Sequence, residues 1–290
     1  MIIKAGLIGC PLTKSLSPRL FRLFSDETGG KYSYDLLETD GPAVALTLGK
    51  IKTRGWAGFN VTLPLKEKIL PFLDSLSPDS KAIGAVNAVR IKHGKLEGHN
   101  TDTVALKLAL KEAGCPLGAR TCVIWGAGGA ARAAAWLLGS SGAKAVDIHN
   151  RSFPKAARLV KYFSGIFPRT AFRARKLTAV PGGAATLFVN ATPLGMYKPL
   201  PVSMRFSGPA GSFYLDFAYA RSLTPFLKDR AGRVISGTDL LIYQALKSSE
   251  LYGGRRIKAS EIVKLKDTLK ASLEEREGKT ARQRGSKRDF

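Results

Sequence analysis

The stretch TCVIWGAGGAARAAAW, from Thr121 to Trp136, says most about the architecture of this chain. An apolar run of strand length ends in a glycine-rich turn that fits G-x-G-x-x-A, and an alanine-rich segment follows. In that context the pattern indicates a dinucleotide-binding βα unit, because Gly126 permits the tight turn and Gly128 lets the backbone approach a pyrophosphate. The alternative is a glycine turn between closely packed elements. The sequence predicts cofactor contacts from Gly126, Ala127, Gly128, Gly129 and Ala130.

The next predicted strand, AVDIHNR at 145–151, indicates which dinucleotide is bound. An acid at the end of this strand would bind the ribose 2′-hydroxyl of NAD, but Asp147 lies inside the strand, three residues too early. Asn150, Arg151 and Ser152 occupy the end, and Lys155 follows. Since a guanidinium matches phosphate oxygens in a bidentate way, this set favours NADP over NAD. The alternative is an exposed arginine on a basic protein.

Strands and helices alternate along most of the chain, which predicts an α/β protein with a mostly parallel sheet and right-handed crossovers. Residues 82–100 form an exception, because their pattern predicts a β-hairpin that turns at His93-Gly94. We expect a helix over KEKILPFLDSL (66–76), one that starts at 237–246, and a last one over 259–275.

The high positive charge of the chain raises the question of whether the protein binds nucleic acid. The chain has 290 residues and a net charge of +24, and the basic residues are spread along its length. A solvated basic surface is favoured over a specific nucleic-acid site, because no binding motif accompanies the charge. The basic end GKTARQRGSKRDF (278–290) lacks apolar periodicity and is expected to be disordered.

Neither a membrane anchor nor a metal is expected. No apolar run approaches the roughly 18 residues that a membrane helix needs, and no targeting segment is visible, so we expect a cytoplasmic protein. Three scattered cysteines indicate neither a disulfide framework nor a metal cluster.

Several segments together resemble the shikimate dehydrogenase family. The opening GCPLTKSLSP (9–18) is similar to the family's G-x-P-x-x-H-S-x-S-P, and NVTLPLK (60–66) matches N-V-T-x-P-x-K. IGAVNAV (83–89), GHNTD (98–102), GAGGAARA (126–133), NRS (150–152), NATPLGM (190–196) and YQA (243–245) follow in the family's order. Together they cover most of residues 6–245 and are highly specific.

The resemblance implies two domains with a cleft between them. Residues 1–103 would form the first part of the substrate domain, 104–236 a Rossmann-type NADP-binding domain, 237–276 the helices that complete the substrate domain, and 277–290 the basic tail. It implies the NADPH-dependent, reversible reduction of 3-dehydroshikimate to shikimate, on the route to aromatic amino acids. Monomer and homodimer are both open.

In the family, the lysine of N-V-T-x-P-x-K and the aspartate of G-x-N-T-D are catalytic, which implies Lys66 and Asp102. The chemistry supports the pairing, because hydride transfer to a ketone builds negative charge on oxygen and a proton must arrive. An ammonium stabilises that charge and a carboxylate orients the ammonium. The alternatives are a surface lysine and an aspartate that caps a helix.

The resemblance also implies the remaining site residues. The positions that match the family's substrate-binding residues are Ser15, Ser17, Thr62, Asn87, Tyr219 and Gln244. On the cofactor side, Thr192 and Met196 match the loop that borders the nicotinamide, and Gly237 lies at the closing edge.

Three positions depart from the family pattern. Lys14 stands in place of histidine, Ala220-Arg221 replaces Asn-Pro, and Thr238-Asp239 replaces an apolar segment that carries a methionine. A quinate/shikimate or aminoshikimate dehydrogenase therefore remains an alternative. An alternative of another class is a non-catalytic, nucleic-acid-binding or regulatory protein on this fold, which the basic tail suggests.

Overall fold

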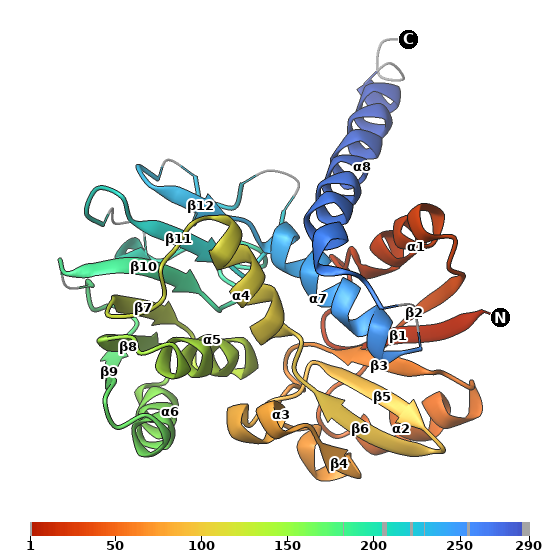
Figure 1. Ribbon diagram of the computed structural model, residues 1–290, viewed down its shortest axis with the longest axis horizontal. Coiled ribbons are helices and arrows are strands. Elements are labelled where there is room, and N and C mark those ends of the chain that lie inside the picture. Colours follow the sequence, from red (N-terminus) through yellow and green to blue (C-terminus); the bar gives the residue numbers. More distant parts are fainter. Residues whose placement is uncertain are drawn as a thin grey trace.

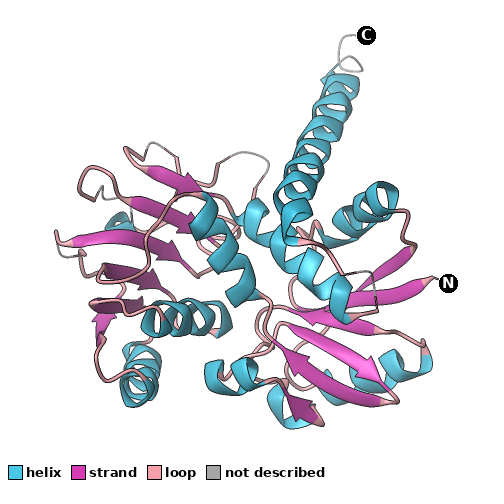
Figure 2. Cartoon of the chain, viewed as in Figure 1, coloured by secondary structure: helices cyan, strands magenta, loops and turns pink. Residues whose placement is uncertain are grey.

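The computed structural model describes residues 2–181, 183–204, 208–220, 223–228, 230–253 and 256–285, with side chains described as far as residue 273. Two sheets of six strands each form the two halves of the molecule, and α4 (Asp102–Glu112) and α7 (Gly237–Leu251) lie between them (Figure 1). Helices pack against each sheet (Figure 2). The fold is therefore the expected α/β arrangement.

The first sheet has the strand order β2-β1-β3-β5-β6-β4. Its elements are β1 (Ile3–Gly9), α1 (Ser17–Thr28), β2 (Tyr32–Glu38), α2 (Val44–Thr53), β3 (Gly58–Val61), β4 (Ser75–Leu76), α3 (Pro78–Ile83), β5 (Ala88–Lys92) and β6 (Lys95–His99). β1 pairs in parallel with β2 and β3, whereas β5 is antiparallel to β3 and β6.

The predicted hairpin is confirmed. Lys92 pairs with Lys95 across a two-residue turn, and His93 and Gly94 have φ angles of 50° and 74°. Two consecutive left-handed residues match the twist of the flanking strands.

The second sheet is parallel throughout and has the order β12-β11-β10-β7-β8-β9. Its elements are β7 (Thr121–Trp125), α5 (Gly129–Ser140), β8 (Ala145–Asn150), α6 (Phe153–Ile166), β9 (Ala171–Lys176), β10 (Ala185–Asn190), β11 (Phe213–Asp216) and β12 (Arg233–Ile235). The sequence pattern did not predict β9 and β12. Both are edge strands and are largely exposed, so neither carries the apolar run that marks a buried strand.

The C-terminal helices return to the first half, as expected. In α7, Leu241 and Ile242 pack in one cluster with Leu20 and Phe21 of α1, and Leu269 of α8 (Ala259–Gly285) joins them. These residues are at most 4% exposed. The N-terminal part of α8 therefore packs against the first half of the molecule, and the rest of the helix extends away from both sheets (Figure 1).

Two expected elements differ in the structure. Residues 66–74 form turns and a short 3₁₀ helix, Leu70–Phe72, and residues 75–76 form β4, because Pro71 lacks the N–H that a helix interior needs. The last helix continues to Gly285 instead of ending at residue 275, and residues 276–284 are mostly good helix formers. Of the predicted disordered tail, residues 286–290 lie outside the described residues.

Candidate active site

The carboxyl ends of strands from both sheets border a cavity of about 690 Å³. Of the predicted substrate and catalytic residues, it is lined by Ser15, Thr62, Lys66, Asp102 and Gln244, and by Tyr219 from the segment that follows β11 of the second sheet. Of the predicted cofactor residues, it is lined by Gly126, Ala127, Gly128, Gly129, Ala130, Asn150, Arg151, Ser152, Lys155, Thr192 and Met196 of the second half, and by Gly237, the first residue of α7. The structure thus brings the site residues inferred from the sequence to one cavity, with the exception of Ser17 and Asn87.

Lys66 and Asp102 form an ion pair at this cavity. Lys66 lies in the turn that follows β3, and Asp102 is the first residue of α4. The Lys66 Nζ is 2.6 Å from the Asp102 Oδ2, and the two side chains are 16% and 4% exposed. Because the Asp102 carboxylate is held out of water, its attraction for the Lys66 ammonium is stronger than it would be in solution.

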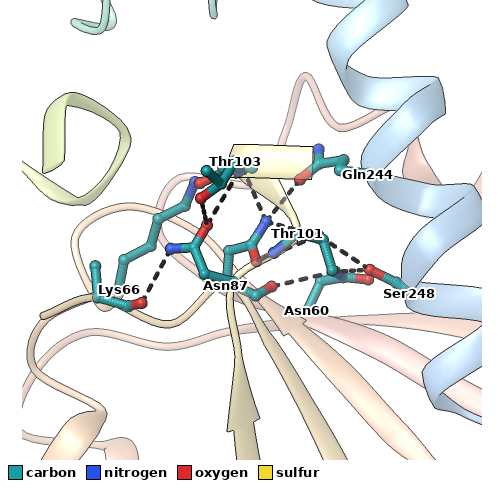
Figure 3. Close-up of polar contacts among 10 residues, drawn as sticks. Asn60, Lys66, Asn87, Thr101, Thr103, Gln244 and Ser248 are labelled. Atoms are coloured by element: carbon teal, nitrogen blue, oxygen red, sulfur yellow. Dashed lines mark hydrogen bonds and ion pairs between the residues drawn. The ribbon is translucent and has the colours of Figure 1, made fainter. Parts of the chain in front are cut away.

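Asn87 fixes Asp102 from behind. Its side-chain nitrogen, which carries two hydrogens, lies 2.8 Å from Asp102 Oδ1 and 3.0 Å from both Thr101 Oγ1 and Gln244 Oε1. Its oxygen accepts from the Thr101 N–H at 2.6 Å. Asn87 is only 1% exposed and does not line the cavity, so its contacts serve to orient the Asp102 carboxylate and the Gln244 amide. The contact between Asn87 and Gln244 is drawn in Figure 3.

Asn60 continues this network toward α7. It accepts from the Tyr34 hydroxyl at 2.9 Å. It also donates to Ser248 Oγ at 2.8 Å (Figure 3). A smaller cavity of about 70 Å³ is lined by Asn60 together with Ser17, and it shares Lys66 and Gln244 with the large one. The structure therefore places Ser17 at this smaller cavity in the first half.

Tyr219 contributes a neutral hydroxyl to the cavity. Burial raises the pKa of Tyr219 to about 12, the charge of Tyr197 adds to the rise, and a hydrogen bond with Ser15 lowers it in part. At neutral pH the phenol therefore keeps its proton and can donate to a ligand.

The glycine turn has the geometry that a dinucleotide needs. Gly126 has φ of +118°, and a Cβ there would lie 2.8 Å from the Ala191 carbonyl oxygen. Nothing lies within 4 Å of the position that a Cβ on Gly128 would take, and α5 has no side-chain cap at its N-terminus. Because Gly128 lines the cavity, its open side and the helix N-terminus face the space that a pyrophosphate would fill.

An exposed group of cations borders the same part of the cavity. Arg151 and Lys155 are joined there by Arg158, which the sequence reasoning missed. Arg158 lies three residues after Lys155 on α6, so the helical spacing was the available signal. Within the described part of the chain, none of these three side chains makes a hydrogen bond or an ion pair. They can bind the 2′-phosphate of NADP.

A buried network of hydrogen bonds holds the segment that follows β10, which was predicted to border the nicotinamide. Asp216, at the end of β11, accepts from Asn190 Nδ2 at 2.9 Å and from the Ala218 N–H at 2.9 Å, and the Thr224 hydroxyl also donates to it. Thr192 in turn donates to Asn190 Oδ1 at 2.6 Å. Burial raises the pKa of Asp216 to about 7, and these hydrogen bonds lower it in part.

Two of the departures from the family pattern have structural roles. Lys14 donates to the Met196 carbonyl and lies 5.0 Å from the Tyr197 ring centre, so it joins the two halves. Asp239 accepts from Ser236 at 2.7 Å and pairs with Lys270 at 2.8 Å, which fixes the start of α7. Residue 221 lies outside the described residues.

Among the described residues, no group of three or more His, Cys, Asp or Glu is placed to hold a metal, and the three cysteines are free thiols. None of the helices described combines the length and the apolar character that crossing a membrane requires.

Comparisons with known proteins agree with this arrangement. The family model of the shikimate dehydrogenase substrate binding domain matches residues 7–89. A shikimate dehydrogenase (NADP(+)) of Carboxydothermus hydrogenoformans is 33% identical over 255 residues, which cover 86% of this chain and 91% of the relative.

Two solved structures are similar over almost the whole chain. Shikimate 5-dehydrogenase of Thermus thermophilus, in complex with NADP(H) and shikimate, has a TM-score of 0.76 and 31% identity, and the match covers 92% of this chain and 99% of that one. Quinate dehydrogenase of Corynebacterium glutamicum, in complex with NAD, has a TM-score of 0.77 and 25% identity, with coverage of 93% and 99%.

Proposed function

The chain belongs to the shikimate dehydrogenase family, and from that premise we propose that its central cavity reduces 3-dehydroshikimate to shikimate, reversibly, with NADPH. It is an NADP-dependent oxidoreductase. The observation that carries the proposal is the 2.6 Å contact between Lys66 and Asp102 in a cavity that the glycine turn also lines. The reduction of a carbonyl needs a hydride donor and a proton donor at the same site. One cavity here is lined by both a dinucleotide-binding turn and an ion pair that can supply a proton.

Lys66 is the group that handles the oxygen of the reacting carbonyl in this proposal. NADPH, when bound, supplies a hydride to the ketone carbon. The Lys66 ammonium stabilises the negative charge that develops on the oxygen and provides its proton. In the reverse direction the amine takes the proton of the shikimate hydroxyl.

Asp102 orients the ammonium and accepts a hydrogen bond from the substrate hydroxyl. Its second oxygen is already held by Asn87 at 2.8 Å, which leaves the carboxylate little freedom to turn. Ser15, Thr62, Tyr219 and Gln244 line the cavity and offer neutral donors and acceptors to the ring hydroxyls and the carboxylate of the substrate. Such fixed contacts orient the reacting carbon toward the nicotinamide.

Arg151, Lys155 and Arg158 give the preference for NADP. Three exposed cations beside the cavity attract the extra phosphate, and no acid stands at the end of β8 to bind a 2′-hydroxyl. We propose in addition a cytoplasmic monomer or homodimer without a specific nucleic-acid partner, with its domains divided at residues 103 and 236.

A two-by-two steady-state assay tests the proposed function. Shikimate and quinate are each oxidised with NADP and with NAD, and kcat/KM is compared. We expect the highest value for shikimate with NADP. Turnover of quinate with NAD alone would contradict the proposal and favour the activity named for the Corynebacterium glutamicum relative. Absence of turnover with all four pairs, together with salt-sensitive RNA binding, would favour a non-catalytic protein.

A further inference from the structure

Gly129 is a glycine at a position where the dinucleotide pattern does not require one. In G-x-G-x-x-A it occupies the fourth place, which admits any residue. It is the first residue of α5, and it is not among the glycines with positive φ, so its backbone conformation is open to residues with side chains. Neither the general dinucleotide pattern nor the backbone conformation requires a glycine at this position.

The contact that explains it lies in the other half of the molecule. A Cβ on Gly129 would lie 2.5 Å from the Cβ of Lys66, 3.0 Å from its Cδ and 3.3 Å from its Cγ. The nearest of these atoms is the base of the lysine side chain, which cannot move away without its backbone. The start of α5 therefore rests directly on the aliphatic stem of Lys66.

The neighbouring glycine meets no such contact. A Cβ on Gly128 would have no atom within 4 Å, because that position opens to the cavity. Two adjacent glycines of one turn thus face two different partners. Gly128 faces the space for the cofactor, and Gly129 faces Lys66.

Contacts beside Gly129 keep the two halves together at this point. Arg132, on the same turn of α5, pairs with Glu67 at 2.9 Å and donates to the Ile83 carbonyl at 2.9 Å. The hydroxyl of Tyr162, on α6, donates to the Ala82 carbonyl at 3.0 Å. Glu67 follows Lys66 in the chain, so the ion pair and the Gly129 contact fix the same short segment of the first half.

We propose that Gly129 is a positioning residue, which sets the distance between the cofactor-binding turn and the Lys66 ammonium by letting α5 close onto the lysine stem. This inference rests on the proposed function. An added methyl group has to separate the two by on the order of 1 Å, and a displacement of that size between reacting groups can cost about a hundredfold in rate. Gly129 also lines the cavity, but alanine keeps the backbone N–H that this position offers at the N-terminus of α5, so we expect the affinity for the cofactor to change little.

Gly129→Ala tests the inference, with Gly128→Ala and Gly49→Ala as comparisons. We expect Gly129→Ala to lower kcat about a hundredfold while the Kd for NADPH, from fluorescence titration, changes by less than about threefold. Gly128→Ala should instead raise that Kd by about tenfold or more, since its methyl group enters the pyrophosphate space. Gly49 lies in α2 with nothing within 4 Å, so Gly49→Ala should leave both quantities as in the wild type.

Two results would overturn the inference. One is a kcat of Gly129→Ala equal to that of the wild type, and the other is a loss of NADPH affinity as large as in Gly128→Ala. Thermal unfolding with and without NADPH shows whether each variant is folded and binds. If the wild type itself lacks turnover, the proposed function fails, whereas an active wild type beside an equally active Gly129→Ala refutes only the positioning role.

Discussion

The two halves of the cavity differ in how their polar side chains are held. On the substrate side, Lys66, Asp102, Asn87 and Gln244 are tied to one another by short hydrogen bonds, and the Asp102 side chain is 4% exposed. On the cofactor side, the exposed cations Arg151, Lys155 and Arg158 make no such contacts within the described residues.

This difference indicates two kinds of function. Groups that act on charge developing during a reaction work best when they are fixed beforehand, because reorganising them would add to the barrier. Groups that bind a phosphate can be ordered by the phosphate itself, at the expense of some affinity. We therefore expect substitutions on the substrate side to change turnover and those on the basic edge to change cofactor affinity.

The largest effect is expected for Lys66→Ala. Removing the ammonium should lower kcat about a thousandfold, since general acid catalysis and oxyanion stabilisation are both lost. The Kd for shikimate, measured by isothermal titration calorimetry, should change much less. Lys52→Ala, an exposed lysine in α2, serves as the control. A variant with normal kcat and weakened shikimate binding would assign Lys66 a binding role only.

The second half of the molecule also contains a buried polar group, Asp216, whose ionisation should affect the stability of the fold. Its pKa is about 7 in the folded protein and near 4 when unfolded, so between these values the folded state binds the additional proton. The contribution of Asp216 to the free energy of unfolding should therefore be fully present below pH 4. As the pH rises from 4 to 7, this contribution should fall by up to about 1.4 kcal/mol per pH unit.

The measurement is the free energy of unfolding of the wild type minus that of Asp216→Asn, from urea denaturation at pH values between 4 and 8. Asparagine does not titrate, so the difference isolates the carboxyl group. A difference that stays constant over this range would show that folding does not raise the pKa of Asp216.

Arg151→Ala should change affinity alone. Loss of a charged hydrogen bond to phosphate should raise the KM for NADPH roughly tenfold to a hundredfold and leave the kcat with saturating NADPH unchanged. The KM for NADH, which has no 2′-phosphate, should not rise. Arg169→Ala removes an exposed arginine of the same half that does not line the cavity, and it should have no effect. An equal rise for NADH and NADPH would place Arg151 elsewhere on the cofactor.

The smallest effect is expected for deletion of residues 279–290. The helix α8 packs in the cluster around α1 and α7 through Leu269 and Leu273, which precede the deletion. Activity and cofactor affinity should therefore stay near those of the full chain. Loss of turnover, or loss of an RNA affinity that the full chain displays, would give the basic end a function of its own.

The sequence was most informative where a local pattern fixes the structure. The strand, glycine turn and helix at 121–136 and the two-residue hairpin at His93-Gly94 are each encoded by neighbouring residues, and both are confirmed by the structure. The expected helix at 66–76 was wrong, because the effect of Pro71 outweighs an otherwise helical pattern. The exposed edge strands β9 and β12 carry no apolar run to detect.

The site was less accessible to sequence reasoning than the fold. Motifs indicate which side chains take part, but not which of them touch. That Asn87 lies behind Asp102, that Arg158 joins Arg151, and that Gly129 rests on Lys66 all depend on how distant segments pack together. Such contacts follow from tertiary packing and have no local signal.

The most direct test of the difference between the two halves is the single-turnover rate of shikimate oxidation at saturating NADP and saturating shikimate. Saturation removes differences in affinity, so only the chemical step and its geometry remain. We predict that Lys66→Ala is slower than the wild type by about a thousandfold and that Arg151→Ala matches the wild type. Equal rates for Lys66→Ala and the wild type, or an equal slowing of both variants, would contradict this account.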